Sequence, residues 1–406
     1  MVIRVLHLSW EYPPPHMVGG LGRHVYHITR HLVKDGVDTT VMSIALPGSP
    51  PSEEVEGGVH VRRVDPFRFR STGFITWVLN FNEEMIEEAL RLYDEWDFDL
   101  IHVHDWLTGP AGIALKHLLH KPLVATIHAT EAGRRGGIHN EEQFIIHSWE
   151  WRITYEAWKV IVCSNYMMNE VSAVHGVPKD KLIMIPNGID ISYIDSVSVK
   201  PGFRDLYAMP SEKIIVFVGR LVHEKGGPDL VLAAFRELLK WDWNLKLLVV
   251  GDGPMREYLM GLAHDWGGIW NKVYFTGRVD DETLYSILKV SDLAILPSRY
   301  EPFGITILEA MAAGLAVITT RVGGPDEIVR DWYNGGVKVS PNNVDEIINV
   351  AKILLSNDEL RRGGIARNAR DSVLRWYTWG RIARWTKKVY QDVLEEYENA
   401  RWVSMW

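Results

Sequence analysis

The stretch Leu293-Ala294-Ile295-Leu296-Pro297-Ser298-Arg299-Tyr300-Glu301-Pro302-Phe303-Gly304-Ile305-Thr306-Ile307-Leu308-Glu309 contains the pattern that decides the fold. Its first four residues form an apolar strand, and Pro302 followed by Gly304 opens a helix. Strand, loop and helix in this order are the repeating unit of a parallel α/β sheet. A helix rises ~1.5 Å per residue, so Glu301 and Glu309 lie up to ~12 Å apart along the chain. This spacing suits two ends of an elongated polyhydroxyl ligand better than an acid and a base acting on one bond.

Apolar strand-like runs and amphipathic helices alternate along the whole chain, which is typical of parallel α/β sheets. The strands expected in the first half are 3–8, 39–44, 59–64, 100–103, 123–127, 160–163 and 182–185. Those expected in the second half are 213–219, 245–250, 273–275, 293–296, 316–319 and 337–339. Further helices are expected from about Leu21 and from Trp379 to about Tyr397. The sequence therefore predicts an α/β fold.

Both halves open with a strand, a glycine-containing loop and a helix, so we expect two Rossmann-like domains that face each other across a cleft. The turn at 186–190, with Asn187-Gly188 in it, indicates the boundary. We expect a first domain at 1–195, completed by about 380–406, and a second domain at 196–379. The last helix is expected to pack back on the first domain.

Composition excludes several classes of protein. The formal net charge of the 406 residues is −8, which argues against nucleic acid as a partner. The single cysteine, Cys163, cannot form an intrachain disulfide and favours a reducing compartment. The first eight residues do not resemble a signal peptide, and no apolar run is long enough to span a bilayer. We therefore expect a cytoplasmic protein; its oligomeric state is not predicted.

Two groups of residues could bind a phosphorylated ligand. Gly219 and Arg220 end a strand, and Lys225 follows five residues later, so the two cations can converge on a diphosphate. Gly19 and Gly20 precede a helix, whose first N–H groups favour an anion. Neither this loop nor the one at 251–254 has the full GxGxxG spacing, so a nicotinamide cofactor is not expected.

His128 also follows a strand, and His104-Asp105 follows another. A metal could be held by His104, Asp105 and His128, but no local spacing such as HExxH is present, and we expect no metal. A polar cluster that contacts sugar hydroxyls is the preferred interpretation. A histidine satisfied in the core remains the alternative for His102.

The polar, glycine-rich segment 131–140 is expected to be a mobile loop, followed by a helix with Trp149, Trp151, Tyr155 and Trp158. This helix mixes charge signs, unlike the basic helices of membrane-surface enzymes. We interpret it as an acceptor-side lip, and peripheral membrane contact stays open.

Taken together, these motifs resemble the retaining glycosyltransferases of the GT-B fold, family 4. The pair Glu301 and Glu309 looks like their E-x7-E signature. The segments 11–14 with 19–22, 186–190, 219–225 and 250–254 are similar in order and spacing. The resemblance covers nearly the whole chain.

The resemblance implies that the N-terminal domain is the acceptor-side domain and the C-terminal domain the nucleotide-sugar-binding one, and it implies a role for each motif. Arg220 and Lys225 should neutralise the leaving nucleoside diphosphate, Glu301 should bind the donor sugar, and Glu309 the ribose. His128 should line the sugar pocket near the anomeric carbon. The implied donor-binding residues are Gly19, Gly20, Asp105, Asn187, Gly219, Phe303, Gly304, Ile305 and Glu309. The family usually needs no metal and no cofactor besides its nucleotide-sugar substrate.

Within this family, the segments 104–106 and 130–134 look like the glycogen and starch synthases. Those enzymes carry Lys-x-Gly-Gly in the first loop, whereas Met17 stands at the position of the lysine here. We expect transfer of a hexose, glucose first, from ADP- or UDP-glucose to a hydroxyl acceptor such as an α-glucan. Whether Met17 changes the choice of donor is open.

Three alternatives remain. The acceptor could be a small sugar, a sugar phosphate or a lipid, with a glucosyl, mannosyl or galactosyl group transferred. A nucleotide-sugar 2-epimerase would share the architecture but use no acceptor. A non-catalytic sugar-binding protein would not need Arg220 and Lys225.

Overall fold

The computed structural model describes residues 2–13, 19–46, 49–55, 57–67, 70–267 and 269–400. The chain forms two compact units. Unit 1 consists of Met1–Gly188 and Trp379–Trp406, and unit 2 consists of Ile189–Thr378. The main break between the units follows Gly188, within the turn at 186–190 that the sequence indicated and seven residues before the expected domain end at 195.

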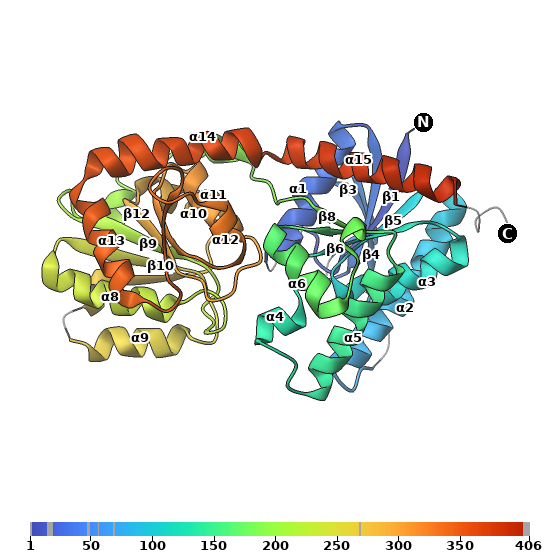
Figure 1. Cartoon of the computed structure of the whole chain (residues 1–406), viewed down its shortest axis with the longest axis horizontal. Coiled ribbons are helices and arrows are strands. Elements are labelled where there is room, and N and C mark those ends of the chain that lie inside the picture. The colour runs from blue at the N-terminus through green and yellow to red at the C-terminus, as the bar shows by residue number, and fades with distance from the viewer. Residues whose placement is uncertain are drawn as a thin grey trace. The chain divides into compact units, whose positions relative to one another are not determined.

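The described part of unit 1 is built on an eight-stranded sheet with the order β3-β4-β2-β1-β5-β6-β7-β8 (Figure 1). Its strands are β1 Ile3–Leu8, β2 Val37–Ile44, β3 Ser52–Val55, β4 Val59–Val64, β5 Leu100–His104, β6 Leu123–Ile127, β7 Lys159–Val162 and β8 Leu182–Met184. All pairings are parallel except that of β3 with β4. Parallel strands covered on both faces are buried on both, and every residue of β5 and β6 is buried accordingly.

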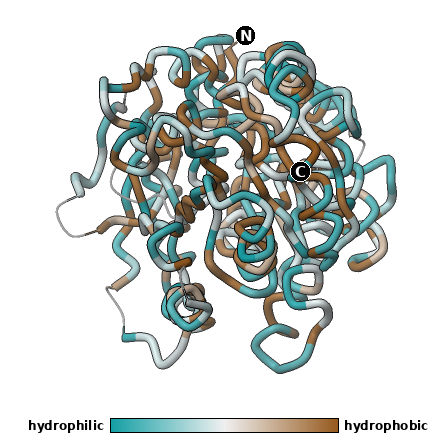
Figure 2. Tube along the Cα trace, turned by 90° about the vertical axis from the view of Figure 1, so that its left-hand side faces the viewer, coloured by the Kyte–Doolittle hydropathy of each residue, from teal (hydrophilic) through white to brown (hydrophobic). Residues whose placement is uncertain are grey.

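Helices connect these strands. The helices of unit 1 are α1 Gly20–Lys34, α2 Phe74–Glu95, η1 Trp106–Thr108, α3 Gly109–Leu119, α4 Glu131–Arg135, α5 Glu141–Glu156, α6 Asn165–His175, η2 Lys179–Lys181 and α15 Trp379–Glu398. Hydrophobic residues concentrate in interior segments, whereas outer loops are mostly hydrophilic (Figure 2).

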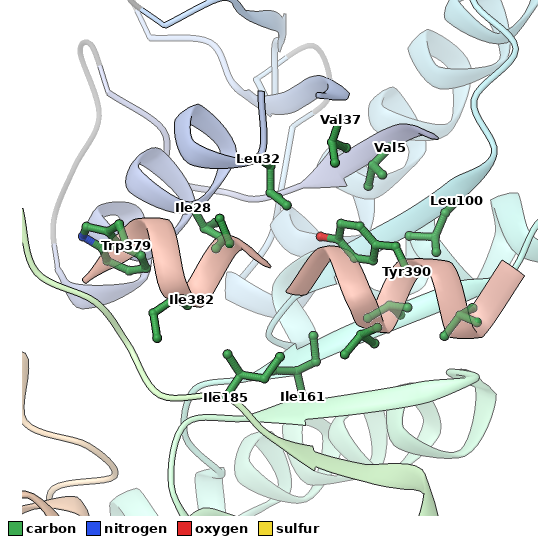
Figure 3. Close-up of a cluster of buried hydrophobic side chains, with 14 residues drawn as sticks. Val5, Ile28, Leu32, Val37, Leu100, Ile161, Ile185, Trp379, Ile382 and Tyr390 are labelled. Carbon is green, nitrogen blue, oxygen red and sulfur yellow. The ribbon is translucent and has the colours of Figure 1, made fainter. Parts of the chain in front are cut away.

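The helix α15 completes the core of unit 1. Trp379, Ile382 and Tyr390 of α15 are buried in one cluster with Val5 of β1 and Ile28 of α1 (Figure 3). Each fully buried aliphatic or aromatic side chain contributes about 1.5–3 kcal/mol relative to an exposed one. The prediction that the last helix packs on the first domain is therefore confirmed.

The described part of unit 2 has a six-stranded parallel sheet with the order β11-β10-β9-β12-β13-β14. Its strands are β9 Lys213–Val218, β10 Leu245–Val250, β11 Val273–Gly277, β12 Leu293–Leu296, β13 Val317–Thr320 and β14 Gly336–Val339. Its helices are α7 Ile191–Ser196, η3 Arg204–Leu206, α8 Pro228–Trp241, α9 Arg256–Asp265, η4 Trp270–Lys272, α10 Asp281–Val290, α11 Ile305–Ala312, α12 Gly323–Ile328, α13 Val344–Ser356, η5 Glu359–Ala366 and α14 Arg367–Trp376. Two α/β units with mainly parallel sheets confirm the predicted fold class.

Two elements differ from expectation. The strand β3 was not predicted, because the polar sequence Ser-Glu-Glu-Val of this antiparallel edge strand lacks an apolar run. The expected mobile loop at 131–140 was partly wrong, since it begins as the helix α4. The side chain of Thr130 caps this helix by accepting a hydrogen bond from N of Gly133 at 2.9 Å.

Candidate active site

The candidate site residues of unit 2 follow two neighbouring strands. The chain runs from β9 to β10 and β11 on one side, and then returns to β12 on the other side of β9. The direction of the sheet order thus switches between β9 and β12, and such switch points bind ligands in open α/β sheets. Gly219 to Lys225 follow β9, and Ser298 to Gly304 follow β12.

The loop after β9 is held by a very close backbone approach from the loop after β10. A Cβ added to Gly251 would lie 1.9 Å from the carbonyl oxygen of Gly219, and Gly251 has φ +130°. N of Leu221 donates a hydrogen bond to the carbonyl oxygen of Asp252 at 2.9 Å. Only glycine satisfies both constraints, so the 251–254 turn positions Arg220 through the backbone.

The structure brings Lys225 and Glu301 together. Nζ of Lys225 lies 3.8 Å from Oε1 of Glu301, and both side chains are partly accessible. Arg220 is exposed, and within the described chain its guanidinium has no hydrogen bond or ion pair. This edge therefore presents the cations Arg220 and Lys225 and the carboxylate of Glu301 to solvent.

Arg299 connects the two loops, a role that the sequence analysis missed. Its guanidinium donates two hydrogen bonds to the carboxylate of Asp229, at 2.8 and 2.7 Å, and its N donates to the carbonyl oxygen of Lys225 at 2.7 Å. Burial acts to raise the pKa of Asp229, but the hydrogen bonds and charge of Arg299 outweigh it and lower the pKa. A bidentate Arg–Asp pair is geometrically specific, so it fixes the backbone beside Lys225.

The helix α11 carries the second glutamate. Gly304 precedes it with φ +105°, a conformation that favours glycine and allows the sharp entry into the helix. Glu309 is buried, with 3% exposure, and its Oε1 accepts a hydrogen bond from the hydroxyl of Tyr285 at 3.2 Å. Tyr285 on α10 was not singled out from the sequence, because only the tertiary fold brings it to Glu309.

Phe303 and Ile305 flank Gly304 in different environments. Phe303 is buried, and its ring packs edge-on against Tyr377 with centroids 6.1 Å apart. Ile305 is half-buried at the first position of α11. The Phe303 side chain thus supports the loop.

In unit 1 the corresponding switch lies between β1 and β5. Gly19 is extended and half-buried before α1, and its N donates a hydrogen bond to Oε2 of Glu11 at 3.1 Å. Gly20 is exposed as the first residue of α1. Met17 lies outside the described residues, as does Val18.

Asp105 holds the residue that was expected to line the sugar pocket. Its Oδ1 accepts a hydrogen bond from N of His128 at 2.7 Å, and its backbone has φ +58°. Asp105 is largely buried, so it positions the backbone of His128. Nε2 of His128 is buried without a hydrogen-bond partner among the described residues.

Asn187 contacts a further histidine, His24 of α1. Oδ1 of Asn187 lies 2.7 Å from Nδ1 of His24, and both residues are buried. The rings of His24 and His128 meet edge-on with centroids 4.7 Å apart. Among these residues, the sequence analysis missed His24, although its place four residues after Gly20 in the same helix could have indicated it.

Buried imidazoles dominate this edge. Burial lowers the pKa of His7 and of His24 to about 3, with the neighbouring histidine His24 or His128 as the second cause. Burial also lowers the pKa of His128 to about 4, followed by the charge of Arg134. These rings are therefore neutral near pH 7. Of the residues considered as metal ligands, His104 and His128 do converge, but with His24 in place of Asp105: one nitrogen each of His24, His104 and His128 lies within 4.8 Å of the others.

Both units match known families of sugar-transferring enzymes. Residues 18–193 match the model described as Glycosyltransferase Family 4, and residues 203–371 match Glycosyl transferases group 1. The chain is 37% identical over 400 residues to an uncharacterized glycosyltransferase of Methanocaldococcus jannaschii, covering 97% of this chain and 99% of that protein. It is 34% identical over 402 residues to the glycogen synthase of Mycobacterium tuberculosis, covering 96% and 94%.

The fold has a close match among solved structures. The sucrose-phosphate synthase of Thermosynechococcus elongatus aligns with a TM-score of 0.82 and 22% identity, over 97% of this chain and 100% of that one. The fold and the two unit sites therefore define a glycosyltransferase of GT-B type. More narrowly, the chain belongs to the group 1, family 4 glycosyltransferases. Among the described residues, no helix combines the length and apolar character needed to cross a bilayer.

Proposed function

We propose that this protein is a retaining hexosyltransferase that moves glucose from a nucleoside diphosphate donor to the hydroxyl of an α-glucan. The observation that carries the proposal is the edge of unit 2, where Lys225 lies 3.8 Å from Glu301 and Arg220 is exposed nearby on the same loop. The similarity to a glycogen synthase over 96% of the chain supports the glucan as acceptor.

The two cations would act on the leaving group. Arg220 and Lys225 would stabilise the charge that develops on the diphosphate as the bond to the anomeric carbon breaks. The departing phosphate oxygen would take the proton of the acceptor hydroxyl, which then attacks from the same face. This step needs no enzymic nucleophile and retains the anomeric configuration.

The two glutamates would hold the ends of the donor. Glu301 is partly accessible and would accept hydrogen bonds from the sugar, whereas Glu309 would bind the ribose hydroxyls with Tyr285 holding its carboxylate. In unit 1, His128 would line the sugar pocket as a neutral ring, because its pKa is lowered to about 4. The proposal includes no metal and no cofactor besides the donor.

The deciding experiment incubates the purified protein with ADP-glucose or UDP-glucose, with and without maltooligosaccharides. Longer glucans with α linkages, formed together with free nucleoside diphosphate, are the expected products. If nucleoside diphosphate is released only with small sugars, sugar phosphates or lipids, the glucan acceptor is wrong. An isomerised nucleotide sugar without transfer would instead identify a 2-epimerase.

A further inference from the structure

Unit 1 contains a second group of convergent polar side chains, away from the residues given roles above. His147 and Glu150 lie three residues apart on one face of α5, and His175 is the last residue of α6. One ligand atom of each lies within 4.8 Å of the other two. The helices α4, α5 and α6 are neighbours in Figure 1.

These groups are buried but incompletely hydrogen-bonded. The side chains of His175 and Glu150 are 0% and 1% exposed. Both ring nitrogens of His175 and Nδ1 of His147 have no hydrogen-bond partner within the described part of the chain. Buried polar atoms normally have partners, and one left without costs about 1–3 kcal/mol. These nitrogens are therefore available as ligand atoms.

His175 and Glu150 do not form a hydrogen bond with each other. Nε2 of His175 lies 3.6 Å from Oε2 of Glu150, beyond hydrogen-bond reach. The carboxylate is instead oriented by N of Glu131, which donates to both of its oxygens at 2.8 and 3.0 Å. Arg134 approaches Oε1 only to 3.4 Å, and burial raises the pKa of Glu150 to about 8, so a bound cation would have to displace its proton.

We propose that His147, Glu150 and His175 bind one divalent transition-metal ion, with Zn²⁺ as the best-suited ion. Two imidazoles and one carboxylate are a common protein ligand set for this ion. Ligand atoms ~2.1 Å from a tetrahedral Zn²⁺ lie about 3.4 Å apart, close to the 3.6 Å between His175 and Glu150. The hydrogen bonds from N of Glu131 orient the Glu150 carboxylate, as hydrogen bonds to metal ligands commonly do.

Other histidines fit less well. His102 cannot contribute, because Nδ1 is hydrogen-bonded to the hydroxyl of Tyr390 at 2.7 Å and Nε2 to that of Thr126 at 2.8 Å. His24 and His128 belong to the candidate active site and have no carboxylate ligand in their group. Of the three groups of possible metal ligands among the described residues, the one on α5 and α6 is the one that includes a carboxyl group.

The ion would have a structural role. Glu150 holds the first residue of α4 through N of Glu131, while His147 and His175 belong to α5 and α6. Binding would connect the three helices and fix α4, which follows the strand end that carries His128. His147 is half-buried, so the ion can enter from its side.

The test uses untagged, full-length protein freed of metal with a chelator. Zn²⁺ affinity is measured by competition with a chromophoric chelator, and Co²⁺ is added separately as an absorbing probe of coordination geometry. We expect one ion per chain, a tetrahedral Co²⁺ spectrum, and an affinity at least about tenfold weaker in His175→Ala and in His147→Ala. His117→Ala, at an exposed histidine paired with Glu156, should bind as the parent does.

Glu150→Gln keeps an oxygen for N of Glu131 but removes the charge, so it should weaken binding while circular dichroism stays unchanged. Absent binding in the parent would overturn the proposal, and so would full affinity in His175→Ala. Loss in His24→Ala together with retention in His175→Ala would place the ion at the other cluster and equally refute it. No donor or acceptor is present, so failure here leaves the proposed transfer reaction unaffected.

Discussion

The two sheets end in opposite chemistry at their switch points. In unit 1 this edge carries buried, neutral imidazoles, such as His24 of α1 and His104 of β5, packed against one another. In unit 2 the equivalent edge presents Arg220 and Lys225 to solvent, beside Glu301. The same α/β plan thus supports a rigid polar wall in one unit and an open charged edge in the other. Charge at the second edge is available to an anionic ligand, whereas the first edge is sensitive to protonation.

The largest expected effect comes from removing the open cations. Arg220→Ala and Lys225→Ala should each lower kcat about 10²–10³-fold, because each loses charge stabilisation of the leaving diphosphate, while donor KM changes much less. Steady-state kinetics with the donor identified by product analysis measures both constants. Lys240→Ala removes an exposed lysine of α8 that pairs with Glu237 and should change neither. Unchanged kcat in Arg220→Ala or Lys225→Ala would contradict the leaving-group role.

Acid should destabilise unit 1 before unit 2. The pKa values of His7 and His24 are about 3 in the folded state and ~6.5 in the unfolded state, so the unfolded chain binds more protons between these values. Their stabilising contribution is therefore complete above pH 6.5 and decreases as the pH falls towards 3. Each should lose about 1.4 kcal/mol per pH unit in this window, or roughly 3 kcal/mol for both at pH 5.5.

Hydrogen exchange read by mass spectrometry at pH 7.5 and 5.5, corrected for intrinsic rates, can assign this loss. Peptides of β5 and β6 should lose protection, whereas those of β9 and β10 should not. The carboxylates of unit 2 with lowered pKa, such as Asp292 and Asp331, act only at lower pH. Equal loss of protection in both units would contradict the contrast between the two edges.

The next effect concerns the turn at 251–254, whose backbone packs against Gly219 and positions Arg220. Gly251→Ala should destabilise unit 2 by more than about 2 kcal/mol, because its Cβ would overlap the carbonyl of Gly219 at a positive φ. Gly261→Ala in α9, with open space around its Cβ, should instead be neutral or stabilise by up to about 1 kcal/mol. Urea denaturation compares the two variants. Equal midpoints would show that the loop after β9 can shift to accommodate the added Cβ, against this prediction.

The smallest effects should fall on donor affinity. Glu309→Gln should weaken nucleoside diphosphate binding about tenfold or more, because a charged hydrogen bond is worth about 1.5–3 kcal/mol. Tyr285→Phe removes only the hydroxyl 3.2 Å from that carboxylate and should weaken binding a few-fold. Calorimetric titration with ADP and UDP measures both. Tighter or unaltered binding in Glu309→Gln would exclude this residue as the ribose ligand.

The fold was largely predictable because buried parallel strands consist mainly of consecutive apolar residues. Each expected strand is present, with ends within two residues of the prediction. The antiparallel edge strand β3 escaped because it is short and polar. Within the candidate site, Lys225 and Glu301 could be expected to meet, since they follow neighbouring strands.

Partners that depend on tertiary packing could not be predicted. Arg299 is hydrogen-bonded to Asp229, which is 70 residues away in the sequence. The contact partner of His24 is Asn187, at a separation of 163 residues. The spacing of His147 and Glu150 places both on one helix face, which can be read from the sequence. It indicates a ligand group only together with His175, which α6 brings beside them.

The chain crosses from unit 1 to unit 2 after Gly188 and returns at Trp379. At this crossing, N of Ile189 donates a hydrogen bond to the carbonyl oxygen of Tyr377 at 2.7 Å, so the two ends of unit 2 are tied together. Unit 2 is continuous in sequence, whereas the core of unit 1 needs Ile382 and Tyr390 from α15. During synthesis on the ribosome, the later unit can therefore complete its core first, while the earlier one must wait for α15 with its apolar strands exposed to chaperones.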